Sequence, residues 1–286
     1  MSAVANKPAR EGSVSELADF VARHRPLTVL SGAGVSTGSG IPGYRDRHGQ
    51  WKRSPPVTIQ EFLGKPAARR RYWARSMRGW PIVAEARPNA AHDALARLED
   101  GGLIGRIVTQ NVDGLHQRAG SSKVIELHGS IGRVTCLGCG ASYARSEVQR
   151  MLVAANAEFE GLAAAAAPDG DADLDAGDLE AFEVPVCSAC GGTLKPDVVF
   201  FGDSVPRERA AAAARAIDDC VAMLVVGSSL MAYSGFRLCE QACGSGKPIV
   251  AINLGRTRAD PLLAFKVEQP CIDALTALVA QMGARR

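Results

Sequence analysis

Four short apolar runs in the chain each end in a glycine-rich or polar loop. The runs and their loops are LTVL (27–30) before SGAGVSTG, IGRIVT (104–109) before QNVDG, VAMLVV (221–226) before GSS, and PIVAI (248–252) before NLG. Apolar residues also recur at helical spacing over residues 13–25, 89–100 and 233–246. Strands alternating with helices predict an α/β fold with a Rossmann-like parallel sheet covered on both faces. Ligands bind at the carboxyl ends of such strands, so the four loops predict one shared site.

The first loop is similar to a phosphate-binding turn but departs from the common dinucleotide fingerprint. Gly32, Gly34 and Gly38 are spaced G-x-G-x-x-x-G, one residue longer than usual. A dehydrogenase would also carry an acidic residue about twenty positions later, where this chain has the basic stretch HGQWKRSPP. The loop alone leaves three interpretations: an off-pattern hydride-transfer enzyme, another use of a nucleotide, or a flexible loop.

The composition is that of an ordinary globular protein. Its 286 residues suffice for one large core plus a small module, and the net charge of +3 does not indicate nucleic-acid binding. Residues 45–78 hold ten Lys and Arg, which form either a solvated face or a surface that attracts an anion. No apolar stretch approaches the ~18 residues of a membrane span. Glu11, Glu16 and Asp19 stand where a signal peptide would be apolar, so we expect a cytoplasmic protein with no membrane partner.

Four of the eight cysteines form two C-x-x-C pairs, CLGC and CSAC. The paired residues are Cys136, Cys139, Cys187 and Cys190. Four thiolates at this spacing complete a closed tetrahedral site, which predicts one structural zinc ion. The alternative is a redox C-x-x-C or unrelated buried thiols. We expect residues 136–190 to form a small zinc-binding module with a flexible acidic loop. It would be inserted between residues 27–135 and 191–275 of the larger α/β part, within a single catalytic domain over 1–286.

Two further patterns in the sequence do not predict a functional site. Cys220, Cys239 and Cys243 have no partner at ligand spacing and are expected to be small core residues. The acidic stretch DGDADLDAGDLE matches the ligand positions of a calcium loop, but Leu174 stands where the turn needs glycine. We therefore do not expect calcium.

Among the histidines, His128 stands out. It follows the apolar run KVIEL and precedes Gly129, just before the cysteine module, where two domains would form a cleft. An imidazole with an ordinary pKa near ~6.5 can act as a general base. Nearby, Gln110, Asn111 and Asp113 follow a strand and could hold sugar hydroxyls or a carboxamide. The other histidines, His24, His48, His92 and His116, are interpreted as core or surface residues.

As a set, these motifs resemble the sirtuins, the NAD-dependent protein deacylases. GAGVSTGSGIPGYR, TQNVDGLH, ELHGS, the two C-x-x-C pairs, KPDVVFFGD, VGSS and INLG occur in that family's order over residues 27–271. RRRYWARSMRGWP, APDGD and the 47 residues between the cysteine pairs are similar to the class II branch, which includes a mitochondrial lipoamidase and ADP-ribosyltransferase. The resemblance implies NAD as co-substrate and acyl-lysine proteins as substrates, and it leaves the oligomeric state open.

The resemblance also implies roles for individual residues. His128 and Asn111 would be catalytic. NAD would be bound by Gly32, Ala33, Gly34, Ser36, Thr37, Ile41, Pro42, Tyr44, Arg45, Trp51, Gln110, Asn111, Val112, Asp113, Gly227, Ser228, Ser229, Asn253, Leu254, Gly255 and Cys271. The acylated substrate would meet Tyr72, Arg75, Val198, Val199, Phe200, Phe201 and Gly202. Residues 41–56 would form a lid over the nicotinamide half of the site, which excludes water.

The implied reaction transfers the acyl group from lysine to ADP-ribose with release of nicotinamide, and His128 deprotonates a ribose hydroxyl. One alternative is a protein mono-ADP-ribosyltransferase that uses the same pocket. A second is a non-catalytic, NAD-sensing zinc module, against which His128 and Asn111 argue. A DNA-binding zinc module is disfavoured because neither C-x-x-C loop is basic enough.

Two positions bear on specificity and rate. Tyr72 and Arg75 form a Y-x-x-R pair, which a related branch uses to bind acidic acyl groups; the alternative is an amphipathic surface helix. Gly43 stands where the family carries Asp before the aromatic residue. We expect the loss of that carboxylate to loosen the lid or weaken a contact near the nicotinamide, giving a competent but slow enzyme.

Overall fold

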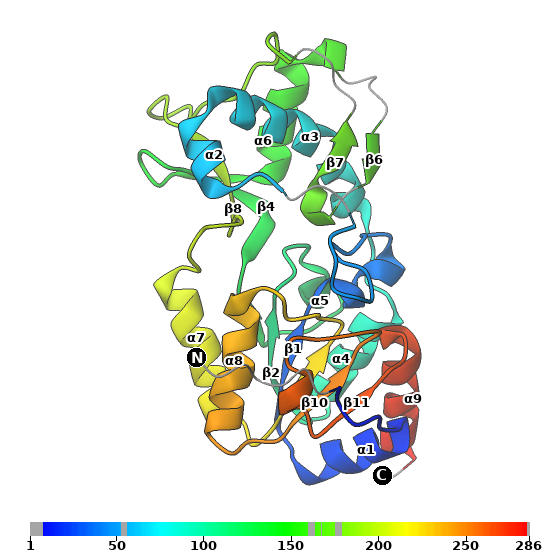
Figure 1. The fold of residues 1–286 in the computed structure, drawn as a ribbon. Coiled ribbons are helices and arrows are strands. Elements are labelled where there is room, and N and C mark those ends of the chain that lie inside the picture. The colour runs from blue at the N-terminus through cyan, green and yellow to red at the C-terminus, as the bar shows by residue number, and fades with distance from the viewer. Residues whose placement is uncertain (1–7, 53–55, 160–163, 167, 175–178, 285–286) are drawn as a thin grey trace.

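The computed structural model describes residues 8–52, 56–159, 164–166, 168–174 and 179–284. Residues 53–55 of the predicted lid, and 160–163, 167 and 175–178 of the predicted acidic loop, lie outside this description. Figure 1 shows a larger lobe that carries both ends of the chain and a smaller lobe built from its middle. None of the described helices is long and apolar enough to cross a bilayer.

The larger lobe is built on a six-stranded sheet in which every pairing is parallel (Figure 1). Its strands are β1 (Leu27–Ser31), β2 (Ile104–Thr109), β3 (Val124–Glu126), β9 (Met223–Val226), β10 (Ile249–Ile252) and β11 (Phe265–Val267). Their order across the sheet is β11-β10-β9-β1-β2-β3. The parallel Rossmann-like sheet predicted from the apolar runs is therefore confirmed.

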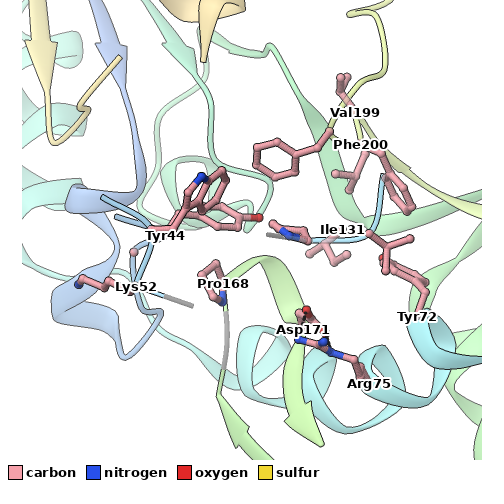
Figure 2. A pocket seen from close by; sticks show the side chains of 15 residues that line it. Tyr44, Lys52, Tyr72, Arg75, Ile131, Pro168, Asp171, Val199 and Phe200 are labelled. Carbon is pink, nitrogen blue, oxygen red and sulfur yellow. Dashed lines mark hydrogen bonds and ion pairs between the residues drawn. The ribbon is translucent and has the colours of Figure 1, made fainter. Parts of the chain in front are cut away.

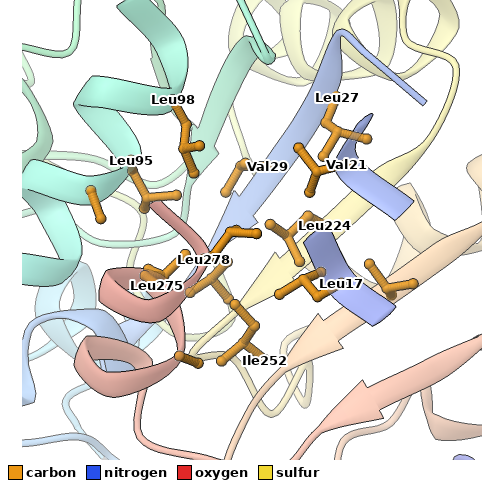
Figure 3. Close-up of a cluster of buried hydrophobic side chains, with 14 of the residues drawn as sticks. Leu17, Val21, Leu27, Val29, Leu95, Leu98, Leu224, Ile252, Leu275 and Leu278 are labelled. Carbon is orange, nitrogen blue, oxygen red and sulfur yellow. The ribbon is translucent and has the colours of Figure 1, made fainter. Parts of the chain in front are cut away.

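Helices cover both faces of this sheet. One face packs against α1 (Val14–Arg23), α4 (Ala90–Asp100) and α9 (Cys271–Gly283), and the other against α7 (Arg207–Asp219) and α8 (Tyr233–Gly244). Figure 3 shows side chains of α1, α4 and α9 meeting Val29, Leu224 and Ile252 of the sheet. Successive strand residues point to opposite faces, so Leu30 joins the cluster on the other side. Burial on both faces explains why these strands read as continuous apolar runs.

The helices begin where their capping residues predict. Ser13 accepts a hydrogen bond from the Glu16 backbone N–H before α1, and Asn89 accepts one from the Ala91 N–H before α4. The four-residue helix α5 (Leu115–Arg118) follows the β2 loop, with Gly114 before it in the left-handed conformation. The loops after β1 form two short 3₁₀ turns, η1 (Ala33–Val35) and η2 (Thr37–Ser39).

The smaller lobe has its own sheet and core. Its sheet is antiparallel, with β4 (Gly129–Cys136) between β5 (Ser142–Ala144) and β8 (Leu194–Val198). Its helices are α2 (Ile59–Gly64), α3 (Pro66–Glu85) and α6 (Arg145–Ala155), joined by the pair β6 (Ala164–Ala166) and β7 (Ala172–Leu174). Phe62 and Trp73 share one buried cluster with Val134 and Val148. The second core thus includes α2 and α3, which the sequence left outside the 136–190 module.

The two lobes meet where β4 begins and β8 ends. Gly129, the first residue of β4, has φ of +87°, and a Cβ there would lie 1.9 Å from the Asp197 carbonyl oxygen. Only glycine fits this crossing. The Val199 N–H then donates to the His128 carbonyl at 2.9 Å, so the segment after β8 is fixed beside His128. This crossing places His128 at the junction of the two lobes, where the sequence predicts it to lie.

Candidate active site

A cleft of about 1040 Å³ runs along the carboxyl ends of β1, β2, β9 and β10 and reaches the segment after β8. All four predicted loops contribute to its lining. The predicted residues that line it are Gly32, Ala33, Gly34, Thr37, Tyr44, Arg45, Trp51, Gln110, Asn111, Val112, His128, Val198, Val199, Phe200, Phe201, Gly202, Gly227, Ser228, Ser229, Asn253, Leu254 and Cys271. The structure therefore brings most of the predicted site residues together at one edge of the sheet.

The glycines of the first loop allow two loops to touch. A Cβ on Gly34 would lie 2.8 Å from the Gly227 Cα, and one on Gly32 would lie 2.7 Å from the Ser228 Cβ. The Gly34 N–H donates to the Gly227 carbonyl at 2.8 Å. A Cβ on Gly38 would lie 2.4 Å from Ile272 in the first turn of α9. The backbone of the β9 loop therefore requires glycine at Gly34, whereas at Gly38 the terminal methyl of Ile272 would have to shift.

Five predicted cofactor residues do not line the cleft: Ser36, Ile41, Pro42, Asp113 and Gly255. Ser36 is buried and donates to Asp113 Oδ2 at 2.7 Å. Asn111 Nδ2 donates to Ser36 Oγ at 3.0 Å and to the Gly32 carbonyl at 3.1 Å. These bonds tie the β2 loop to the β1 loop and fix the orientation of the Asn111 side chain.

His128 has a defined tautomer. Its Nδ1 lies 3.0 Å from the Gln110 carbonyl oxygen, which can only accept, so Nδ1 carries the hydrogen. Nε2 then keeps its lone pair and accepts from Ser234 Oγ at 2.7 Å. Burial lowers the pKa of His128, and the bond to the Gln110 carbonyl raises it in part. The ring is therefore neutral at pH 7, with its basic atom held by a hydroxyl that also lines the cleft.

Ser234 is one residue of the site that sequence reasoning missed. It lies in the first turn of α8, the helix that follows the GSS loop of β9. Its position just after a predicted ligand loop is the one signal that could have found it. The cleft also gains positive charge from Arg47, Arg237 and Arg256, which the sequence analysis did not select.

An aromatic group separates the cleft from a side pocket. The rings of Tyr44, Trp51 and Phe201 lie edge to face, with centroids 5.3 to 6.0 Å apart. The Arg45 guanidinium stacks 4.0 Å from the Trp51 ring and donates to the Gly49 carbonyl at 2.8 Å. The described part of the predicted lid is thereby packed onto the strand-like segment after β8.

The side pocket shares Tyr44, Trp51 and residues 198–201 with the cleft and ends between α3 and Ile131. Tyr72 packs on Phe200, with ring centroids 5.0 Å apart. Arg75, expected to meet an acidic acyl group, instead holds Asp171, as Figure 2 shows. Tyr72 and Arg75 thus both lie in this pocket, but Arg75 is already bound to a carboxylate of the chain.

The two C-x-x-C pairs come together at the far end of β4. Their four Sγ atoms lie within 4.8 Å of one another, with 3.5 Å between Cys136 and Cys190 and 3.7 Å between Cys139 and Cys187. Zn–S bonds of about 2.3 Å in a tetrahedron place sulfurs about 3.8 Å apart. The four thiols therefore fit one zinc ion, with no position left for a substrate.

The remaining cysteines divide into two groups. Cys220 and Cys239 are buried, as expected of core residues, whereas Cys243 is exposed on α8 and the expectation was wrong for it. Cys243 falls on the solvent side of a helix whose buried residues include Cys239 and Ala242. Cys271 begins α9 and lines the cleft, and burial raises the pKa of its thiol to about 12.

The cleft lies at the carboxyl edge of a parallel sheet, has glycine walls and basic side chains, and contains a neutral, half-buried histidine. Together with the four-cysteine cluster, these features define a dinucleotide-dependent enzyme with a structural metal module. Residues 32–234 match the family described as SIR2: Sir2 family. The chain belongs to the Sir2 family.

The similar proteins agree with this assignment. NAD-dependent protein deacetylase 2 of Bradyrhizobium diazoefficiens is 58% identical over 263 residues, covering 92% of this chain and 96% of that protein. An NAD-dependent protein deacetylase of Bordetella bronchiseptica is 53% identical over 95% of this chain and 99% of its own length. A solved structure described as Sir2-p53 peptide-NAD+ has a TM-score of 0.77 at 31% identity and covers 96% of this chain and 100% of its own.

Proposed function

We propose that this protein is an NAD-dependent protein-lysine deacylase of the deacetylase type. The observation that carries the proposal is His128, whose Nε2 lone pair is held in a cleft that branches into an apolar side pocket. NAD supplies the ADP-ribose that accepts the acyl group. The relatives named as NAD-dependent protein deacetylases support the same conclusion.

Each part of the site has a defined task in this proposal. The glycine loop, Gln110 and Ser228 bind the dinucleotide, and the arginines of the cleft meet its diphosphate. Asn111, fixed by Gly32 and Ser36, orients the nicotinamide ribose. His128 accepts the proton of a ribose hydroxyl at Nε2, which its neutral state at pH 7 allows. The exposed edge after β8 receives the substrate backbone, and the side pocket takes the acyl chain.

The test is turnover of acyl-lysine peptides with NAD, read by mass spectrometry. The wild type should remove the acyl mass from lysine and release nicotinamide, whereas a mono-ADP-ribosyltransferase would add ADP-ribose to its target. His128→Tyr should abolish the reaction. His24→Tyr is the matched control, because His24 follows α1 and lies away from the cleft. Equal turnover by His128→Tyr and wild type would exclude His128 as the base, whereas no turnover by the wild type with any acyl peptide would leave a binding protein as the better explanation.

We also infer three finer assignments that rest on the sequence. The stretch RRRYWARSMRGWP and the 47 residues between the cysteine pairs favour the class II branch. The cytoplasmic location and the acyl-lysine proteins as natural partners remain predictions. Cell fractionation and an acyl-proteome comparison of a deletion strain test them.

A further inference from the structure

The side pocket contains one bidentate ion pair. Arg75 Nε donates to Asp171 Oδ1 and Arg75 Nη2 donates to Asp171 Oδ2, both at 2.8 Å (Figure 2). Each side chain is about a quarter exposed and both line the pocket. Arginine binds carboxylates through such two-pronged contacts, so Asp171 occupies one edge of the guanidinium by which an acidic ligand could bind and neutralises its charge.

The backbone holds Asp171 in this position. Residues 168–171 cross over α3 at Gly79, where a Cβ would lie 2.3 Å from the Asp171 carbonyl oxygen. Gly170 adopts φ of +69° with its open side against Ile131 and Trp80. A glycine inside a helix costs about 0.5–1 kcal/mol relative to alanine. Gly79 therefore has a structural purpose, the close approach of the Asp171 segment.

Among the residues that the structure describes, the rest of the pocket offers no equivalent of this pair. The other described lining residues are aromatic or aliphatic, apart from Lys52. Lys52 is exposed, and Figure 2 shows its amine directed away from Arg75 and Asp171. An acyl carboxylate that entered the pocket would be desolvated beside Asp171, which is also negative.

We propose that Asp171 is a specificity-determining residue, an internal carboxylate that occupies Arg75 and makes the pocket select uncharged acyl groups over those that end in a carboxylate. The inference rests on the proposed deacylase function and names its substrate class. Asp171 binds Arg75 in place of a ligand carboxylate. Removing the charge of Asp171 converts the same pocket into a site for acidic acyl groups.

The experiment compares succinyl-lysine and butyryl-lysine peptides, which have equal carbon number and differ in the terminal carboxylate. For wild type, kcat/KM with NAD should strongly favour butyryl. Asp171→Asn keeps the shape but removes the charge, and should raise the succinyl-to-butyryl ratio by about tenfold or more. Adding Arg75→Met to Asp171→Asn should return the ratio to the wild-type value. Glu180→Gln, an exposed change in the same acidic segment, is the control for loss of charge and should leave the ratio unchanged.

A second variant reaches the same position from α3. Gly79→Ala forces the Asp171 segment away from the helix and should also raise the ratio, which keeps the test valid if Asp171→Asn folds poorly. Binding of fluorescent succinyl-lysine peptide, measured by anisotropy, must tighten in both variants and needs no turnover. An unchanged ratio and unchanged binding overturn the proposal for Asp171. Absence of NAD-dependent turnover with every acyl peptide would instead overturn the proposed function.

Discussion

His116 should make the stability of this protein depend on pH. The imidazole is buried under the β1 and β2 loops, and its Nε2 lies 2.8 Å from Ser31 Oγ. Ser31 Oγ donates to Thr109 Oγ1, so it accepts from His116 and Nε2 carries the hydrogen. Nδ1 is buried and has no hydrogen-bond partner among the described residues. A second proton would have to sit there without an acceptor.

These surroundings lower the pKa of His116 to about 3, first through burial and then through the neighbouring His92. In the unfolded chain the pKa of His116 has its ordinary value of 6.5. Below that pH the unfolded chain therefore binds a proton at His116 that the folded chain does not bind. The free energy of unfolding therefore falls as the pH falls from 6.5 towards 3. At pH 5 the folded ring is still neutral, and linkage gives a loss of about 2 kcal/mol relative to pH 7.5.

The assay is urea denaturation at pH 7.5 and pH 5.0, followed by tryptophan fluorescence. His116→Gln lowers stability at both values, but its decrease between them should be smaller than that of wild type by about 2 kcal/mol. The difference between variants cancels contributions from other groups, such as the cysteine thiols. His48→Gln changes an exposed histidine and should keep the wild-type dependence. Parallel decreases for His116→Gln and wild type would refute the reasoning.

Three further changes test the site. Ser234→Ala removes the hydroxyl that donates to His128 Nε2. It should alter kcat by about 2- to 10-fold, the value of one hydrogen bond, with little change in the apparent KM for NAD. An unaltered kcat and pH–rate profile would contradict this prediction. Gly43→Asp should raise NAD-dependent turnover, because a Cβ at Gly43 would have Ala33, at 3.9 Å, as its one neighbour among the described residues and would fit there without a clash. A folded variant with no gain would count against this prediction. Zinc removal by a chelator, or Cys139→Ser, should release one zinc ion, lower the Tm and abolish deacylation; retained activity in zinc-free protein would exclude a structural role.

The parallel sheet and most of the cleft were predictable because their signals are local. Strands buried on both faces give continuous apolar runs, and each loop follows its strand directly in sequence. The contacts that complete the site are not local. Ser234 lies 106 positions from His128, and Asp171 lies 96 positions from Arg75. No pattern in either segment indicates the partner.

The second core shows the same limit in another form. Residues 66–85 carry many arginines and read as a basic surface helix, yet Trp73 and Met77 are buried against the cysteine module. Arg145 of α6 is buried against α3, where it stacks on Trp73 and Trp80 and donates to Ser76. The buried side of α3 is therefore decided by the tertiary contacts of the helix and not by its pattern of charged and apolar residues.

The four-cysteine cluster and His128, the proposed base, occupy opposite ends of the same two strands. β4 runs from Gly129, next to His128, to Cys136, and β8 runs back from Leu194, two residues beyond Gly192 of the second cysteine hairpin, to Val198. Gly129 pairs with Val198 at one end and Cys136 with Leu194 at the other, so the two strands form one antiparallel ribbon with a register shift between Ser130 and Val134. Zinc bound at the cysteine end would hold together the two strands that lead to His128 and to the segment after Val198. A metal site without a free coordination position can act on catalysis in this way, by keeping the segment after β8 beside His128.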